Sequence, residues 1–148
     1  MNYSALEFKL EPILCVCGSD KEMKELIEDS KKASQGKEFV LLLDNKEKLV
    51  KRVLPAFMNA AIRVEDRIAR SDTIQIEMLL LLCGTMKIDK AIKNCGANNS
   101  ENFLLFSTNS SLLNRFAKKN GIRIARKIDL ELDAKTAEEV AMTELLEE

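Results

Sequence analysis

Apolar residues recur along the chain with two different spacings, and the change between them marks the expected elements. Short continuous apolar runs, typical of buried strands, lie at 8–17, 39–43 and 103–106. From Ile122 the period becomes two, which predicts a fourth strand with a bulge or a bend at Arg126. One face of that strand is expected to carry Ile122, Ile124, Ile128, Leu130 and Leu132.

Between the strands, apolar residues are spaced three and four apart, as in helices with one buried face. Ser19 with Glu22, and Asp44 with Glu47, have the spacing of a capping box, which predicts that a helix begins at each. Pro55 lies inside the second helix and should kink or split it, because proline removes a backbone donor. Further helices are expected from Ser71 to Cys83 and at 87–95, 110–120 and 136–146.

Two of these helices have an inward face that the pattern defines residue by residue. In the helix at 87–95 the inward residues should be Ile88, Ala91, Ile92 and Cys95. In the helix at 110–120 they should be Leu112, Leu113, Phe116 and Ala117. The order of elements gives four strands and about six helices in an α/β layer arrangement, within one domain spanning 1–148.

Composition narrows the class of protein. The 148 residues are 46% hydrophobic and 32% charged, which is typical of a globular chain. The longest apolar run, from Met78 to Cys83, is too short to cross a bilayer, and the first residues lack the apolar stretch of a signal peptide. We therefore expect a cytoplasmic protein that does not bind membranes.

Charge is distributed unevenly along the chain. Residues 46–128 carry sixteen bases against seven acids, whereas residues 129–148 carry one base against eight acids. Such asymmetry is typical of a face that meets a polyanion or an acidic partner. The alternative is a solvated surface that the acidic ends of the chain neutralise.

The residue types argue against an enzyme. There is no histidine, so no Ser-His or Cys-His nucleophile can be assembled, and the four cysteines form no C-x-x-C pair for zinc. Cys15, Cys17, Cys83 and Cys95 belong to apolar segments, where reduced thiols pack as small hydrophobes. The glycines are not clustered as in phosphate-binding loops. We expect no metal, cofactor or small-molecule substrate, although a hidden pair of acid and base residues is an alternative.

Two features stand out as candidate binding surfaces. The helix from Thr73 to Cys83 is apolar around its whole circumference in the last two turns, which is typical of an enclosed helix or of one that a partner protein buries. In the long helix before it, polar residues repeat opposite the apolar stripe, and lysines follow in the helix at 87–95. The basic residues are Arg52, Arg63, Arg67, Arg70, Lys87, Lys90 and Lys93. They suit phosphate binding or form an ordinary solvated face.

One stretch, Lys48 to Phe106, resembles a known family. It contains Arg52-Val53, Ala56-Phe57, the run Ile76-Glu77-Met78-Leu79-Leu80-Leu81-Leu82-Cys83-Gly84, then Ile88, Ala91-Ile92 and Gly96-Ala97. This succession is similar to archaeal members of the small kinase-binding subunit family of the KEOPS complex, the family of the PRPK-binding protein. Met86 and Lys87 depart from the family's usual residues, which are polar or basic at the first position and glutamine at the second.

The resemblance implies a central, largely antiparallel sheet flanked by helices. It also implies a non-catalytic subunit that binds the small atypical kinase/ATPase of KEOPS and the 3′ CCA end of tRNA, in support of threonylcarbamoyladenosine formation. The residues predicted to dock the kinase are Met78, Leu82, Met86 and Ile88. Those predicted to bind tRNA are Arg63, Arg67, Arg70, Lys87 and Lys90. The alternatives are a stand-alone RNA-binding module and a small enzyme.

Overall fold

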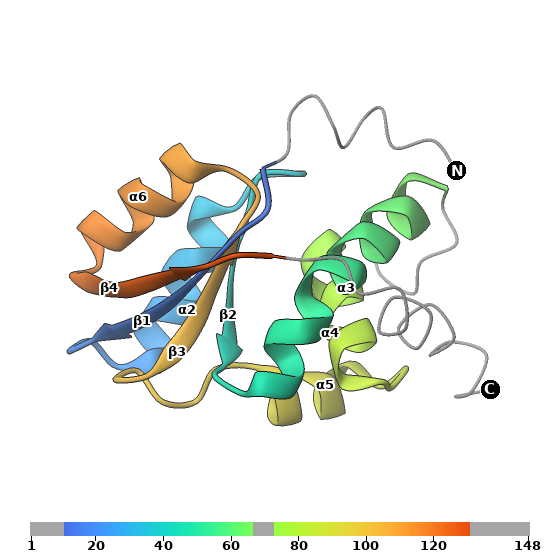
Figure 1. Cartoon of the computed structure of the whole chain (residues 1–148), viewed down its shortest axis with the longest axis horizontal. Helices are drawn as coiled ribbons and strands as arrows, with labels where there is room; N and C mark the ends of the chain where they lie inside the picture. The colour runs from blue at the N-terminus through green and yellow to red at the C-terminus, as the bar shows by residue number, and fades with distance from the viewer. Residues whose placement is uncertain (1–10, 67–72, 131–148) are drawn as a thin grey trace. The chain divides into compact units, whose positions relative to one another are not determined.

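The computed structural model describes residues 11–66 and 73–130. The elements, in chain order, are β1 (Ile13–Ser19), α2 (Met23–Ala33), β2 (Val40–Asp44), α3 (Glu47–Glu65), α4 (Ile74–Cys83), α5 (Ile88–Cys95), β3 (Phe103–Ser107), α6 (Ser110–Lys119) and β4 (Ile122–Ile128) (Figure 1). The strands form one antiparallel sheet in the order β2-β3-β1-β4. The predicted α+β class is confirmed, with five helices in these two ranges instead of about six. The helix expected at 136–146 lies outside the described residues.

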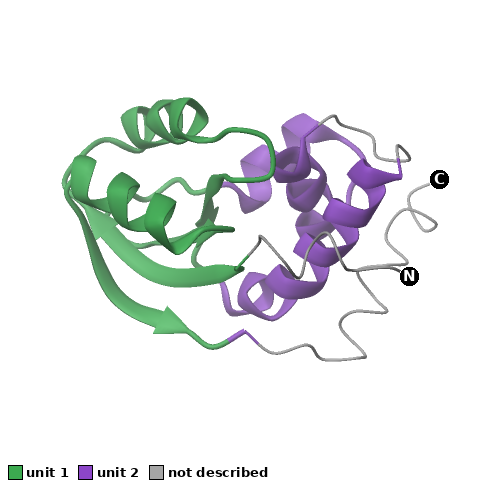
Figure 2. Ribbon diagram, turned by 90° about the horizontal axis from the view of Figure 1, so that it is seen from above, with its two compact units in different colours: residues 1–45, 97–129 green, residues 46–96, 130–148 purple. Residues whose placement is uncertain are grey.

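The chain divides into two compact units (Figure 2). Unit 1 contains the sheet with α2 and α6, and unit 2 contains α3, α4 and α5. In unit 1 the segments β1-α2-β2 and β3-α6-β4 interleave their strands, which is the ferredoxin-like, split βαβ topology. Residues 46–96 of unit 2, which contain α3, α4 and α5, lie between β2 and β3 in the sequence. The expectation of a single domain over the whole chain stays a prediction.

Both helices of unit 1 lie on the same side of the sheet (Figure 2). An apolar cluster joins them to it, built from alternate strand residues and from one face of each helix. Its members are Ile13, Cys15, Cys17, Leu26, Val40, Leu42, Ala97, Phe103, Leu105, Leu112, Leu113, Phe116, Ala117 and Ile122. The predicted inward face of α6 is therefore confirmed.

The helices do not begin at the predicted capping boxes. The N-cap residues of α2 and α3 are Glu22 and Lys46, and neither side chain caps its helix. Ser19 and Asp44 are instead the last residues of β1 and β2. Both predictions are wrong because each strand extends to the residue that was expected to cap the next helix.

Helix α3 continues through Pro55, so the predicted split is wrong. A proline nitrogen cannot donate to the carbonyl four residues earlier, which here belongs to Lys51. Lys51 is exposed, so water can satisfy that carbonyl. The Asn59 side-chain amide donates to the carbonyl oxygen of Pro55 at 2.9 Å and adds a bond to the next turn.

The predicted bulge in β4 is confirmed. Val16 pairs with Arg126 and Cys17 pairs with Ile124, which leaves Ala125 as the extra residue. Because an extra residue reverses the alternation of side chains, Ile122 and Ile128 lie on opposite faces of the sheet. The expectation that one face carries all the isoleucines of this strand is therefore wrong.

The close approach of β1 to the segment before β3 generates a prediction. A Cβ atom at Gly18 would lie 2.5 Å from the backbone oxygen of Glu101. That backbone cannot retreat easily, because the amide of Ser19 donates to the carbonyl of Ser100 at 2.7 Å. We expect Gly18→Ala to lower the free energy of unfolding by about 1–3 kcal/mol in urea denaturation.

The control is Gly36→Asn. Gly36 has φ 61°, a Cβ atom added there would meet nothing within 4 Å, and asparagine tolerates this left-handed conformation. We expect this variant to change the free energy of unfolding by no more than about 0.5 kcal/mol. Equal losses in the two variants would contradict the steric argument.

Candidate functional site

Helix α5 exposes part of its apolar stripe. Ala91 and Cys95 are buried, whereas Ile88 is 41% and Ile92 is 49% exposed. The expectation that all four face inward is therefore wrong for the two isoleucines. The reason is that α5 packs chiefly against α4, which covers only one narrow side of so short a helix. Two neighbouring apolar side chains in solvent make this face of α5 a candidate binding surface, since contiguous exposed apolar area is what marks such surfaces.

The residues around this pair are mainly basic. Lys87, Lys90 and Lys93 are all exposed, and Asp89 is the one acid in α5. The turn before the helix is held by Thr85, which is buried and whose hydroxyl accepts a hydrogen bond from the amide of Lys87 at 3.2 Å. We define the α5 surface as Met86, Ile88 and Ile92 with these three lysines, where Met86 is half-buried.

The apolar helix α4 is enclosed. Met78 is 0% and Leu82 is 1% exposed, and only Gln75, Ile76 and Cys83 of this helix are partly exposed. The prediction that Met78 and Leu82 offer their side chains to a partner is therefore wrong. Of the four residues predicted to dock the kinase, Met86 and Ile88 are accessible.

Arg63 is also buried, contrary to the expected exposed stripe. It is 8% exposed, and its Nη1 lies 3.7 Å from Oε1 of Glu77, a residue of α4 that is fully buried. The side of α3 that carries Arg63 packs against α4, and a buried carboxylate needs a nearby cation. Arg52 likewise serves this interface, because its Nη2 donates to the carbonyl oxygen of Leu81 at 3.0 Å. Arg67 and Arg70 lie outside the described residues.

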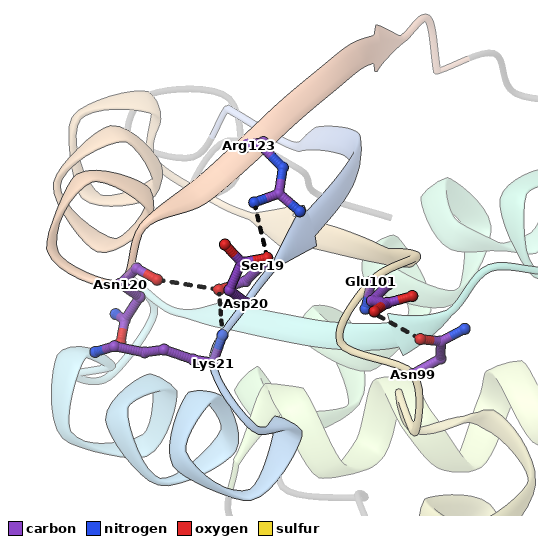
Figure 3. Close-up of polar contacts among 7 residues, drawn as sticks. All are labelled: Ser19, Asp20, Lys21, Asn99, Glu101, Asn120 and Arg123. Carbon is purple, nitrogen blue, oxygen red and sulfur yellow. Dashed lines mark hydrogen bonds and ion pairs between the residues drawn. The ribbon is translucent and has the colours of Figure 1, made fainter.

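Unit 1 contains a polar cluster at the carboxyl end of β1 that the sequence did not reveal (Figure 3). The buried Ser19 hydroxyl donates to the carbonyl oxygen of Asn120 at 3.1 Å and accepts from the amide of Lys21 at 3.2 Å. Lys21 Nζ donates to Oδ1 of Asn120 at 3.1 Å, and Arg123 pairs with Asp20 at 3.3 Å. These contacts are all internal and tie β1 to the turn between α6 and β4. No local signal marks the contacts with Asn120 and Arg123, because these residues lie about a hundred positions from their partners.

A cleft of about 320 Å³ lies between α2 and α6 in the same unit. It is lined by Asp29, Lys32, Ala33, Gln35, Glu38, Leu112, Arg115, Phe116, Lys119 and Asn120. Charges of both signs line it, and Oε1 of Glu38 already accepts a hydrogen bond from Nδ2 of Asn109 at 3.0 Å. The cleft thus has no single charge character that would select a ligand.

Residues 11–66 and 73–130 bring together no three Cys, Asp or Glu side chains that could hold a metal ion. No helix within these ranges is long and apolar enough to cross a bilayer. No family model and no curated protein matches the sequence. Within the part of the chain that the structure describes, we take the α5 surface as the candidate site, because it combines exposed apolar and basic side chains.

The burial of Arg63 generates a prediction about stability. Arg63→Ala leaves the Glu77 carboxylate buried without this cation, so we expect the free energy of unfolding to fall by about 3–5 kcal/mol in urea denaturation. Replacing both residues, as Arg63→Met with Glu77→Leu, should restore much of the loss, because neither charge of this buried pair is then left without the other.

The matched control is Lys51→Ala. Lys51 and Glu47 have the same nitrogen–oxygen distance of 3.7 Å, but their side chains are 66% and 87% exposed. We expect Lys51→Ala to lower the free energy of unfolding by less than about 0.5 kcal/mol. A comparable loss in Lys51→Ala would show that burial does not set the strength of the Arg63–Glu77 pair.

Proposed function

We propose that this chain is a non-catalytic subunit of the tRNA-modifying KEOPS complex. In this proposal it binds the small atypical kinase/ATPase of the complex and the 3′ CCA end of tRNA in the cytoplasm, and so supports threonylcarbamoyladenosine formation. The resemblance over Lys48 to Phe106 is the reason for proposing this complex. The observation that carries a binding role is the exposure of Ile88 and Ile92 on α5.

The α5 surface has the composition of a protein-docking site. Apolar side chains that a partner desolvates contribute most of the binding energy, while charged residues at the rim exclude water and guide association. Ile88 and Ile92 supply the apolar centre, and the lysines supply the rim. They replace the enclosed Met78 and Leu82 as the proposed kinase contacts, alongside Met86.

The proposed tRNA contacts are the exposed lysines of the α5 surface. Lys87 and Lys90 remain candidates, and Lys93 joins them because it is equally accessible. Arg63 is withdrawn because it pairs with Glu77 in the interface between α3 and α4. Arg67 and Arg70 remain predictions from the sequence. Lysine side chains bind phosphate as point charges, which suits contact with a tRNA backbone without reading its bases.

A binding role also agrees with the chemistry of the sequence. The chain has no histidine, the side chain that most often transfers protons near neutral pH. A stand-alone RNA-binding module would bind tRNA without associating with the kinase. A small enzyme would show turnover that depends on a carboxylate.

The kinase contact is tested with Ile88→Asp/Ile92→Asp. Two carboxylates in a desolvated apolar contact should weaken binding to the cognate kinase at least tenfold in titration calorimetry. The control is Ile124→Asp, because Ile124 is 43% exposed and lies on β4 in unit 1. Unchanged affinity of the double variant, or an equal loss in the control, would reject the α5 surface as the docking site.

The tRNA contact is tested with Lys87→Glu/Lys90→Glu/Lys93→Glu. If three phosphates are contacted, the slope of log affinity against log salt should become less negative by about 2, since each contact releases counterions. The control exchanges three exposed lysines of unit 1 for glutamate, namely Lys24, Lys31 and Lys118, which changes the net charge equally. Equal slopes for the two triple variants, or unchanged binding to tRNA lacking CCA, would contradict the proposed contact.

A further inference from the structure

The two edges of the sheet in unit 1 differ in how their backbone groups are used. The strand order leaves β2 and β4 at the edges (Figure 1). On β2 the amide of Val40 donates to the Ser34 hydroxyl at 3.2 Å. The carbonyl oxygen of Leu42 accepts from the amide of Ala97 at 3.3 Å. On β4, within the described part of the chain, residues 124–127 make no hydrogen bond outside their ladder with β1. The outer backbone of β4 is therefore open to a further strand.

Exposure along β4 agrees with an uncovered edge. A strand with one face against helices commonly alternates between buried and exposed side chains. In β4 all five central residues are exposed, and only Ile122 and Ile128 at its ends are buried. Side chains on both faces of this strand thus reach solvent. We define the β4 edge as Arg123, Ile124, Ala125, Arg126 and Lys127.

The bulge at Ala125 arranges the two arginines of this edge. Arg123 pairs with Gly18 of β1, and Arg126 pairs with the residue two positions earlier in that strand, Val16. Residues three apart in a regular strand lie on opposite faces, but the extra residue brings both arginines to the same face. Because their β1 partners are two residues apart, they lie roughly 7 Å apart along the sheet. This is the spacing of alternate side chains in an extended chain.

The charges of the β4 edge all have one sign. Residues 122–128 contain two arginines, one lysine and no acid. Arg123 pairs with Asp20 at 3.3 Å, but the two side chains are 61% and 93% exposed, so solvent screens this pair and it exchanges easily (Figure 3). Arg126 and Lys127 form no ion pair with any residue in the described ranges. The strand therefore presents positive charge beside an open backbone.

These features together select the occupant. A second copy of the chain does not suit the edge, because two β4 strands side by side would place cations opposite each other. A nucleic acid could neutralise the cations, but it has no peptide groups to continue the ladder. It would also leave Ile124, which is 43% exposed, without an apolar contact. An extended acidic peptide matches the backbone, the charge and the apolar side chain at once.

We propose that the β4 edge docks an extended acidic segment of a second protein, which joins the sheet as a strand outside β4. Its peptide groups hydrogen-bond to β4 and supply affinity. Its carboxylates, at alternate positions, face Arg123 and Arg126 on one side of the sheet and set specificity. Apolar residues between them contact Ile124 on the other side. This surface belongs to unit 1 and does not depend on the function proposed for the α5 surface.

The test titrates the full chain with a fluorescent peptide of alternating glutamate and valine and follows the anisotropy. We expect saturable binding that Arg126→Glu/Lys127→Glu weakens about tenfold or more, because the cations become anions. The control is Lys24→Glu/Lys31→Glu, which changes the net charge equally at two exposed positions of α2. It should weaken binding by about twofold or less, since charges away from the edge are screened.

A second peptide separates strand addition from attraction between charges. N-methylation of its backbone amides keeps every carboxylate but removes the donors of a ladder, so binding should be lost. Equal binding of the methylated peptide, or an equal loss in the two charge variants, would overturn the proposal. So would competition by a single-stranded RNA that depends on Arg126 and Lys127 and exceeds that of the peptide.

The chain's own acidic residues supply the last comparison. Residues 129–148 carry one base and eight acids, so they are a possible competitor for the same cations. A full chain in which the acids of 131–148 are replaced by their amides is titrated with the same peptide. Binding to the unaltered chain supports the proposal, whereas binding that appears only after this replacement would assign the edge to the chain's own segment and overturn it.

Discussion

The structure depends on the antiparallel pairing of β2 with β3. Val40 lies opposite Ser107 and Asp44 lies opposite Phe103, so the two strands pair along their whole length. The chain between them forms α3, α4 and α5. The exit and return points are held together, because the Asn45 amide donates to the Asn102 side chain at 2.8 Å and the amide of Ala97 donates to the carbonyl of Leu42 at 3.3 Å. A three-helix segment can thus interrupt a ferredoxin-like sheet without disturbing its strand order.

The sequence predicts this fold well where the signal is local. The apolar runs place the strands within a few residues, and the spacing of Leu112, Leu113 and Phe116 identifies the buried face of α6. The polar residue at Arg126 correctly marks the bulge. The strand order could not be predicted, because β1 pairs with β3 about ninety residues later in the chain and with β4 more than a hundred residues later, and no turn connects them.

The errors at the candidate site share one physical cause. Periodicity shows which side of a helix is apolar, but it does not show how much of that side a neighbouring helix covers. For this reason Ile88 and Ile92 were expected inside and are exposed, whereas Arg63 was expected outside and is buried against Glu77. The α5 surface therefore results from how the helices pack. Helix α4 is enclosed, and the exposed apolar side chains belong to the shorter helix α5.

The central position of β1 constrains how the chain forms during synthesis. Its neighbours in the described sheet are β3 and β4, so after the end of β1 has been translated about 80 residues must follow before the first residue of β3 can pair with this strand. At about 5–20 residues per second this is a delay of roughly 4–16 s. The contacts of α3, α4 and α5 are nearer in sequence and become available first. The apolar strand β1 is therefore translated first and stays unpaired while the inserted helices already make their contacts. During this interval β1 is the segment that a nascent-chain chaperone would be expected to shield.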